Sequence, residues 1–265
     1  MPWGLDLEFI DMADPSQVET AMRPNTRLLW FETPSNPMME IVDIRRIAEI
    51  AQASGAISVI DGTLTTPVLQ RPLDLGVDLV VHSTTKFLGG HGDVVGGTII
   101  SKVKDEIFDR IRLIQQTGGA VPSPFDCWLI LRGICSIPYR VRAQTEHAGQ
   151  IAAFLHEHPL VETVHYPGHA VAAGQMVGFG AMLSFQVRSG ERAAVSVAAW
   201  TRLITRATSL GGAESLIEHR ASIEGRESQT PVNLLRLSVG LENPADLIED
   251  FRQAFERLEN TPRVC

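Results

Sequence analysis

The residues between positions 59 and 97 have side chains whose types and order could perform chemistry. Two apolar runs, Ala56–Ile60 and Leu79–Val81, are predicted to be buried parallel strands, because they contain β-branched residues without polar alternation. Asp61 follows the first run, and a hydroxyl-rich stretch that ends in Lys86 follows the second. Residues just past the carboxyl ends of strands line the ligand crevice of an open α/β sheet. We therefore expect one carboxylate, several hydroxyls and one amine to converge there.

These side chains suit pyridoxal 5'-phosphate (PLP), which needs a lysine amine for its aldehyde, an acid for its ring nitrogen and donors for its phosphate. On this interpretation Lys86 bonds the aldehyde and Asp61 pairs with the ring nitrogen. Ser83 and Thr85 turn their hydroxyls to the phosphate. The spacing alone also allows a strand-end aspartate followed by a solvated Ser/Thr loop with a surface lysine.

Four separated motifs carry a resemblance to a known family. They are E-T-P-S-N-P (Glu32–Pro37), V-I-D-G-T (Val59–Thr63), H-S-T-T-K-F-L-G-G-H-G-D (His82–Asp93) and R-L-S-V-G-L-E (Arg236–Glu242). In this order they closely resemble the Cys/Met-metabolism family of PLP enzymes, which includes cystathionine γ-synthases, cystathionine lyases, methionine γ-lyases and homoserine-ester sulfhydrylases. The resemblance covers nearly the whole chain, from about Gly4 to the C-terminal helix.

The resemblance implies an α/β fold of the PLP-dependent aminotransferase type (fold type I), with a mainly parallel sheet and helices on both faces. A smaller C-terminal α+β domain is expected beside it. We expect a truncated PLP-binding large domain over residues 1–125 and a substrate-side domain over residues 126–265. The predicted strands are Leu5–Met12, Arg27–Phe31, Gly96–Ser101, Val161–His165, Ala181–Val187 and Leu234–Val239, besides the two above. The predicted helices are Pro15–Met22, Ile44–Ser54, Val103–Gln115, Phe125–Gly133, Tyr139–His156, Ala193–Ile204, a short one after Ser209–Gly212, and a last one from Pro244.

The resemblance also implies roles for single residues near the cofactor. Lys86 would bind the cofactor and then move protons between substrate carbons, as γ-chemistry requires. Asn36 would lie against the cofactor ring and the substrate, and Thr63 would belong to the same cofactor site. An asparagine that bonds its own turn is the alternative for Asn36. Where the family commonly has Asn after the aspartate, this chain has Gly62.

Three residues of the C-terminal half are expected to bind the substrate. Arg236 lies between two leucines of a predicted strand, where a charge is costly without a partner. A guanidinium there could capture an α-carboxylate in a bidentate manner, with help from Ser209, or it could form an internal salt bridge. Thr208 stands where relatives that handle cystathionine by γ-chemistry often have glutamate. A neutral threonine cannot attract a distal ammonium group, which weakens the case for a cystathionine γ-lyase.

The most similar activity is that of cystathionine γ-synthase, acting by γ-replacement or elimination on a sulfur amino acid or an O-acyl-homoserine. Methionine γ-lyase and cystathionine β-lyase activities are the alternative reactions. The resemblance implies that an N-terminal segment of the family, with an aromatic ring and a phosphate-binding helix start, lies outside this sequence. A catalytically impaired fragment that keeps the fold and associates with a full-length relative is therefore the alternative function.

The composition limits the partners. At 265 residues the chain has a net charge of −8 and a pI near 5.5, which argues against nucleic acid and anionic membrane surfaces. The sequence has no membrane-spanning run and no signal-peptide pattern. Its three cysteines are odd in number, form no C-x-x-C pair and predict a reducing, cytoplasmic setting. No spacing predicts a metal site, and the resemblance implies a homo-oligomer, a dimer or tetramer.

Overall fold

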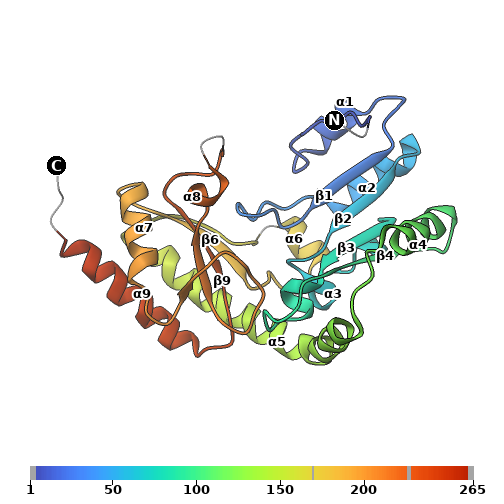
Figure 1. Ribbon diagram of the computed structural model, residues 1–265. Coiled ribbons are helices and arrows are strands. Elements are labelled where there is room, and N and C mark those ends of the chain that lie inside the picture. The colour runs from blue at the N-terminus through green and yellow to red at the C-terminus, as the bar shows by residue number, and fades with distance from the viewer. Residues whose placement is uncertain (1–3, 169, 226–227, 262–265) are drawn as a thin grey trace.

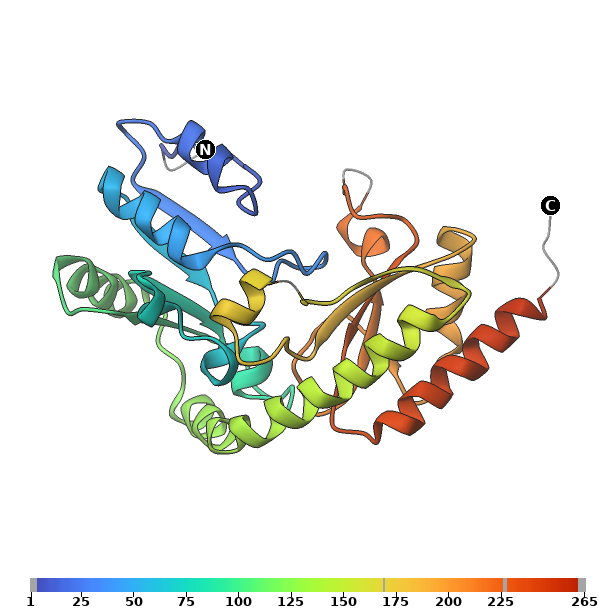
Figure 2. The same ribbon diagram turned by 180° about the vertical axis from the view of Figure 1, so that it is seen from behind.

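The computed structural model describes residues 4–168, 170–225 and 228–261. Two β-sheets lie in the two halves of the molecule, and a long helix extends along both halves (Figures 1 and 2). The strands are β1 (Leu28–Glu32), β2 (Ile57–Asp61), β3 (Leu79–Ser83), β4 (Gly97–Ser101), β5 (Val161–His165), β6 (Met182–Val187), β7 (Thr205–Arg206), β8 (Leu216–His219) and β9 (Leu234–Ser238). The helices are α1 (Pro15–Ala21), α2 (Ile44–Ser54), α3 (Thr66–Leu69), α4 (Glu106–Gly118), α5 (Pro124–Glu157), α6 (Ala170–Gln175), α7 (Glu191–Trp200), α8 (Arg220–Glu224) and α9 (Pro244–Glu259), with helical turns η1 (Pro72–Leu75) and η2 (Thr84–Leu88).

The N-terminal sheet has the order β1-β2-β3-β4, in which the first three strands are parallel and β4 is antiparallel. This confirms the two parallel strands that were predicted to end near Asp61 and before Lys86. Leu29 and Phe31 of β1 pack with α1 and α2 on one face of the sheet. Leu28 and Trp30 point to the other face and are exposed, so β1 is half-exposed rather than buried as predicted.

The bounds of the helix α2 could be predicted from the sequence, because every signal that sets them is local. The Asp43 side chain accepts a hydrogen bond from the Arg46 amide, and Gly55 adopts φ 71° just after the last turn. Ile44, Ile47 and Ala51 form its buried stripe. Cap, stripe and terminating glycine all lie within one short segment, and the predicted bounds are confirmed.

The C-terminal sheet has the order β5-β6-β9-β8-β7 and is antiparallel except for the β7–β8 pair. Alternate residues of its central strands, such as Phe185, Leu235 and Ile217, join α5, α7 and α9 in the largest apolar core. Residues of opposite parity form a polar row across β6, β9 and β8. This row consists of Ser184, Arg236 and Glu218.

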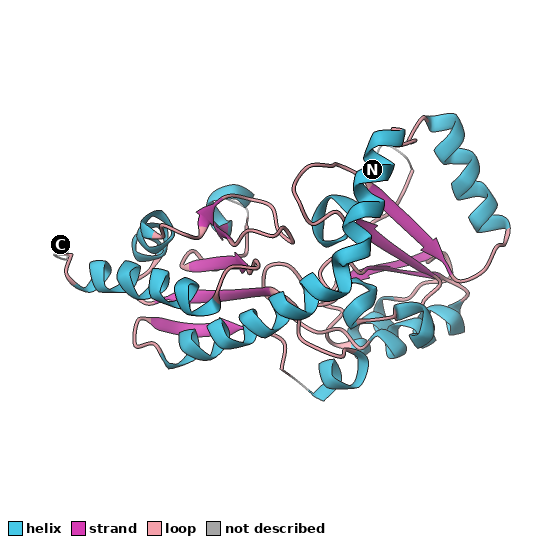
Figure 3. Ribbon diagram, turned by 90° about the horizontal axis from the view of Figure 1, so that it is seen from below, coloured by secondary structure: helices cyan, strands magenta, loops and turns pink. Residues whose placement is uncertain are grey.

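The structure corrects several predicted elements. The segment Leu5–Met12 is not a strand, and Leu7 and Phe9 within it are exposed. The predicted helices Phe125–Gly133 and Tyr139–His156 belong to one continuous helix, α5 (Figure 3). Pro138 lies inside this helix. Burial of Ile137 on one side of the proline and Val141 on the other offsets the lost backbone hydrogen bond.

Three further predictions differ from the structure. The helix predicted to begin at Val103 begins instead at Glu106, because Asp105 caps it by accepting from the Phe108 amide at 2.9 Å. The helix predicted to reach Ile204 ends at Trp200. The turn Ser209–Gly212 leads into the strand β8, not into a helix, because pairing with β9 and β7 overrides local propensity.

A third apolar cluster lies at the junction of the two sheets. It includes Phe87 and Leu88, immediately after Lys86, together with Ile137 and Val141 of α5 and Leu210. The predicted domain boundary near residue 125 falls at the start of α5, which contacts elements of both halves. That boundary stays a prediction. Among the helices of the described segments, none combines the length and apolar character needed to cross a membrane.

Candidate active site

Lys86 lies in the turn η2, directly after the carboxyl end of β3. Its backbone (φ −90°, ψ −129°) departs from helical geometry and interrupts the turn. The amine Nζ lies 3.1 Å from the Ser209 hydroxyl. Burial, followed by the nearby Arg236 guanidinium, lowers the pKa of the Lys86 amine, while Glu218 opposes the shift. A lysine in this setting is held closer to its nucleophilic, neutral form than a lysine in water.

Arg236 lies in β9, directly opposite Glu218 of β8, and only 4% of the arginine is exposed. The two side chains form a buried ion pair, so the internal salt bridge considered from the sequence is present. The guanidinium also reaches the N-terminal half of the molecule, where Nη1 donates to Asn36 Oδ1 at 3.1 Å. Within its own half, Nη2 donates to the Ser209 carbonyl at 3.1 Å. Burial lowers the pKa of Arg236, and Glu218 opposes that shift.

Asp61 ends β2 at the same edge of the sheet from which Lys86 emerges. Its carboxylate accepts a hydrogen bond from the Thr63 amide at 2.9 Å, and the Thr63 hydroxyl accepts from the Ser83 amide at 2.8 Å. Glu32 of β1 is the register partner of Asp61. Burial raises the pKa of Glu32, and the neighbouring Asp61 adds to the rise, while a hydrogen bond from the Asn36 amide opposes it.

The predicted phosphate-binding hydroxyls lie at the start of η2. The Thr85 hydroxyl is engaged by Gly96, whose amide donates to it at 2.9 Å and whose carbonyl accepts from it at 3.3 Å. The Thr84 hydroxyl is buried and has no hydrogen-bond partner among the described residues. Thr85 therefore has a structural role in this arrangement, and a phosphate would share its hydroxyl with Gly96.

His82 explains the glycine at position 62. The imidazole lies so close to Gly62 that a methyl group added there would meet its Cε1 atom at 2.8 Å. Burial lowers the pKa of His82, while the Asp61 carboxylate opposes this shift. The imidazole thus fills space that an asparagine side chain at position 62 would need.

The donor set at this edge fits PLP. It offers an amine of lowered pKa at Lys86, the carboxylate of Asp61, and the hydroxyls of Ser83 and Thr84. Thr84 in particular has an unsatisfied buried hydroxyl, which is costly unless a partner is supplied. An α/β fold with such a set at the carboxyl edge of its parallel strands defines the class of PLP-binding enzymes.

Comparison with known proteins gives the same class and a narrower family. The model of the family "Cys/Met metabolism PLP-dependent enzyme" matches residues 1–256. Cystathionine gamma-synthase of Mycobacterium tuberculosis is 44% identical over 263 residues, which cover 95% of this chain and 68% of that protein. Cystathionine gamma-lyase of Bacillus subtilis is 40% identical, covering 96% and 70%.

A solved structure agrees over the same length. MetB from Corynebacterium glutamicum superposes with a TM-score of 0.92 at 41% identity, covering 97% of this chain and 69% of that one. The chain belongs to the Cys/Met metabolism family of PLP-dependent enzymes. It is therefore a transsulfuration-type enzyme whose cofactor is PLP and whose fold is type I, as the sequence motifs predicted.

Sequence reasoning missed three charged or titratable side chains at the site: Glu32, His82 and Glu218. Glu218 follows two apolar residues, Leu216 and Ile217, but precedes His219 and Arg220, so the local sequence gives little sign that its carboxylate is buried. The partner could not be found, because Glu218 and Arg236 are 18 positions apart and the register of β8 against β9 is not set by the local sequence.

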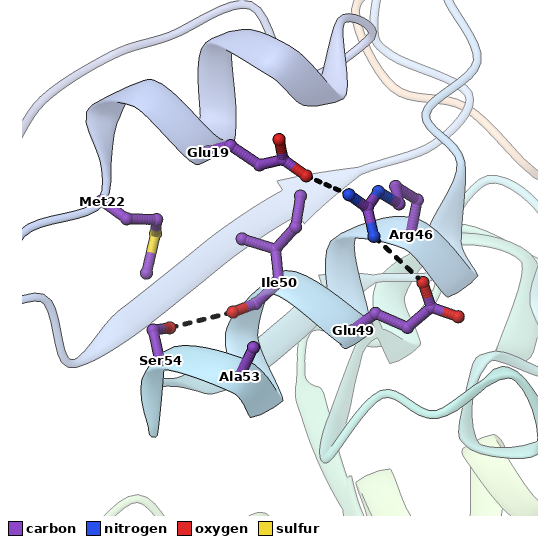
Figure 4. Close-up of a pocket in the computed structure, with 7 residues that line it drawn as sticks. All are labelled: Glu19, Met22, Arg46, Glu49, Ile50, Ala53 and Ser54. Atoms are coloured by element: carbon purple, nitrogen blue, oxygen red, sulfur yellow. Dashed lines mark hydrogen bonds and ion pairs between the residues drawn. The ribbon is translucent and has the colours of Figure 1, made fainter.

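Two hollows differ in their relation to this site. One of about 290 Å³ is bordered by Arg206, Thr208 and Glu218, with apolar residues of α7 and β8. The other lies between α1 and α2, and its charges pair with each other: Arg46 bonds Glu19 and lies 3.3 Å from Glu49 (Figure 4). None of the predicted site residues lines this second hollow.

Proposed function

We propose that this chain catalyses γ-replacement or γ-elimination on a sulfur amino acid or an O-acyl-homoserine, in the manner of cystathionine γ-synthase. The observation that supports this most is the contact of the Lys86 amine with Ser209, whose own carbonyl binds Arg236. A proton-transfer amine and a carboxylate-binding guanidinium are then joined through one residue. An α-amino acid held by Arg236 would present its Cα to Lys86.

Each residue has a proposed task in this reaction. Bound PLP would supply an electron sink that makes the substrate's Cα proton acidic. Lys86 would bind the cofactor aldehyde and, when freed by the substrate amine, carry protons from Cα and Cβ. Asp61 would keep the ring nitrogen protonated, and Thr63, which bonds Asp61, would hold that carboxylate in orientation. Ser83 and Thr84 would border the phosphate, together with Thr85, whose hydroxyl also bonds Gly96.

Arg236 is proposed to bind the substrate α-carboxylate. Its fork already donates to Asn36, Ser209 and Glu218, so a carboxylate would use the remaining N–H groups or displace the Asn36 amide oxygen. Asn36 would then turn its amide toward the substrate. Burial of the ion pair keeps the guanidinium in place, since a buried arginine with fixed partners loses little further rotamer freedom on binding.

The cavity at Thr208 is proposed to receive the distal part of the substrate. Thr208 is neutral, and the adjacent Arg206 forms no ion pair with any described residue. A cation here favours a distal carboxylate over a distal ammonium group. We therefore rank an O-acyl-homoserine with a carboxylate-bearing acyl group above cystathionine as the substrate.

The test is a substrate panel of O-succinyl-homoserine, O-acetyl-homoserine, cystathionine and methionine, each with and without cysteine. In the wild type, kcat/KM should be highest for O-succinyl-homoserine with cysteine. In Arg206→Met, kcat/KM should fall more for O-succinyl-homoserine than for O-acetyl-homoserine. Preferred turnover of cystathionine or methionine would overturn the γ-synthase proposal in favour of a lyase.

A second candidate is a catalytically impaired chain that keeps the fold and associates with a full-length relative. The exposed apolar side chains on one face of the N-terminal sheet favour it: Leu28 and Trp30 of β1 are about half exposed. Sedimentation of the purified chain with and without a full-length relative tests it. A monomer in both samples would refute this candidate.

A further inference from the structure

Two polar side chains of α5 are buried at the junction of the two sheets. Arg140 is 6% exposed and Gln144 is 0% exposed. Because they are four residues apart, they lie on the same face of the helix. No ion pair joins Arg140 to an acidic residue within the described ranges. A buried cation and a buried amide are costly, so their contacts should reveal what they do.

Arg140 binds the backbone of the segment that carries Lys86. Its Nη2 atom donates to the carbonyls of Phe87 at 3.0 Å and Gly133 at 2.9 Å, and its Nε atom donates to the Ser136 hydroxyl at 3.0 Å. The approach is close, because a methyl group added at Gly90 (φ +73°) would lie 2.1 Å from Nη1. The Arg140 guanidinium thus links Phe87, the residue after Lys86, to Gly133 and Ser136 of α5.

Gln144 binds the turn that contains Ser209, the residue whose hydroxyl the Lys86 amine contacts. Its Nε2 atom donates to the Gly212 carbonyl at 2.7 Å, in the turn that contains Ser209, and to the Val239 carbonyl at 3.1 Å. The turn touches the lysine segment directly, because a methyl group added at Gly211 would lie 2.7 Å from the Phe87 amide nitrogen. One helix face therefore binds both segments that bring Lys86 and Ser209 together.

We propose that Arg140 and Gln144 are positioning residues, which fix the Lys86 segment and the Ser209 turn against α5 and so hold the Lys86 amine in its half-buried place beside Ser209. The inference rests on the proposed role of Lys86, although its test does not require turnover. Without these hydrogen bonds the lysine segment moves toward water, and the amine titrates like an ordinary lysine. Neither side chain touches the amine itself.

The small number of lysines allows each one to be followed separately in an acetylation experiment. It contains three lysines, of which Lys102 and Lys104 are exposed and serve as internal references. The cofactor-free chain is acetylated with trace acetic anhydride across a pH series, and peptide mass spectrometry gives the extent at each lysine. The variants are Arg140→Met and Gln144→Met. The controls are Arg142→Met and Gln150→Met, which make the same changes at exposed positions of α5.

In the wild type and both controls, Lys86 should titrate at lower pH than Lys102 and Lys104. In Arg140→Met its midpoint should rise by about one pH unit, which is about a tenfold loss of free amine at neutral pH, and Gln144→Met should shift it less in the same direction. Folded variants whose Lys86 curve superposes on that of the wild type would overturn the proposal, even if they unfold more easily.

Two measures keep the result interpretable. If Arg140→Met fails to fold, Ser136→Ala removes only the hydroxyl that receives Nε, and it must shift the Lys86 midpoint upward by a smaller amount for the proposal to stand. The role of Lys86 is checked separately, by adding PLP to the wild type, reducing with borohydride and mapping the modified peptide. Absence of label on Lys86 there contradicts the proposed function, whereas an unshifted titration contradicts the positioning role.

Discussion

The Lys86 amine lies 3.1 Å from the Ser209 hydroxyl, although the two residues are 123 positions apart. Lys86 follows β3 of the N-terminal sheet, and Ser209 precedes β8 of the C-terminal sheet. The contact thus joins the two halves of the molecule at the place where the proposed chemistry occurs.

Lys86→Ala should abolish attachment of the cofactor. The amine is the proposed nucleophile toward the PLP aldehyde, and the other two lysines are exposed and lie outside the site. The measurement is the visible absorbance of the chain after incubation with PLP and dialysis. Lys102→Ala should retain the band of the wild type. Retention of the same band in Lys86→Ala would refute the assignment.

Ser209→Ala should lower the pKa of the Lys86 amine further. The hydroxyl accepts a hydrogen bond from the charged amine, and a hydrogen bond to a charged form favours that form. The backbone carbonyl that binds Arg236 remains in the variant. The acetylation titration measures the shift, with Thr208→Ala as the neighbouring control. A Lys86 curve that moves to higher pH would contradict the contact.

Glu218→Gln should destabilise the fold strongly. The carboxylate is the buried counter-charge of Arg236, and removing one partner of a buried pair costs about 3–5 kcal/mol. Glu249→Gln removes one partner of an exposed ion pair with Arg252 and should change the free energy of unfolding by less than about 1 kcal/mol. Urea denaturation compares the two variants. Equal decreases in the free energy of unfolding would show that the buried pair stabilises the fold no more than the exposed pair does.

Glu32→Gln should change how stability depends on pH. Burial raises the pKa of Glu32 in the folded state, so the folded chain holds this proton to higher pH than the unfolded chain does. In the wild type the contribution is fully present below the unfolded pKa near 4.5 and is lost as the pH rises through the folded value. The glutamine variant lacks this loss, so its stability relative to the wild type should increase with pH across that window. Denaturation at several pH values measures it, with Glu40→Gln as an exposed control, and a constant difference would contradict the prediction.

Much of the fold followed from short patterns. The helix α2, with cap, apolar stripe and glycine, and the last helix α9, with Asn243 as cap and Pro244 in its first turn, were predicted with their starting residues. The predictions were wrong where tertiary contacts outweigh local preference. Pro138 lies inside α5 because apolar residues on both sides of it are buried, and β8 forms because it pairs with β9.

The sequence by itself determined the family and the cofactor, and it predicted the edge where we propose that the reaction occurs, because Asp61 and the Lys86 motif follow adjacent parallel strands and need only strand direction to meet. Only the tertiary structure decided how Arg236 is neutralised and how Lys86 is held. The partner of Arg236 depends on the register between β8 and β9, and the contacts of Lys86 depend on a helix face and a turn brought from elsewhere in the chain. Such pairings arise from packing of segments distant in sequence, and no local pattern of residues encodes them.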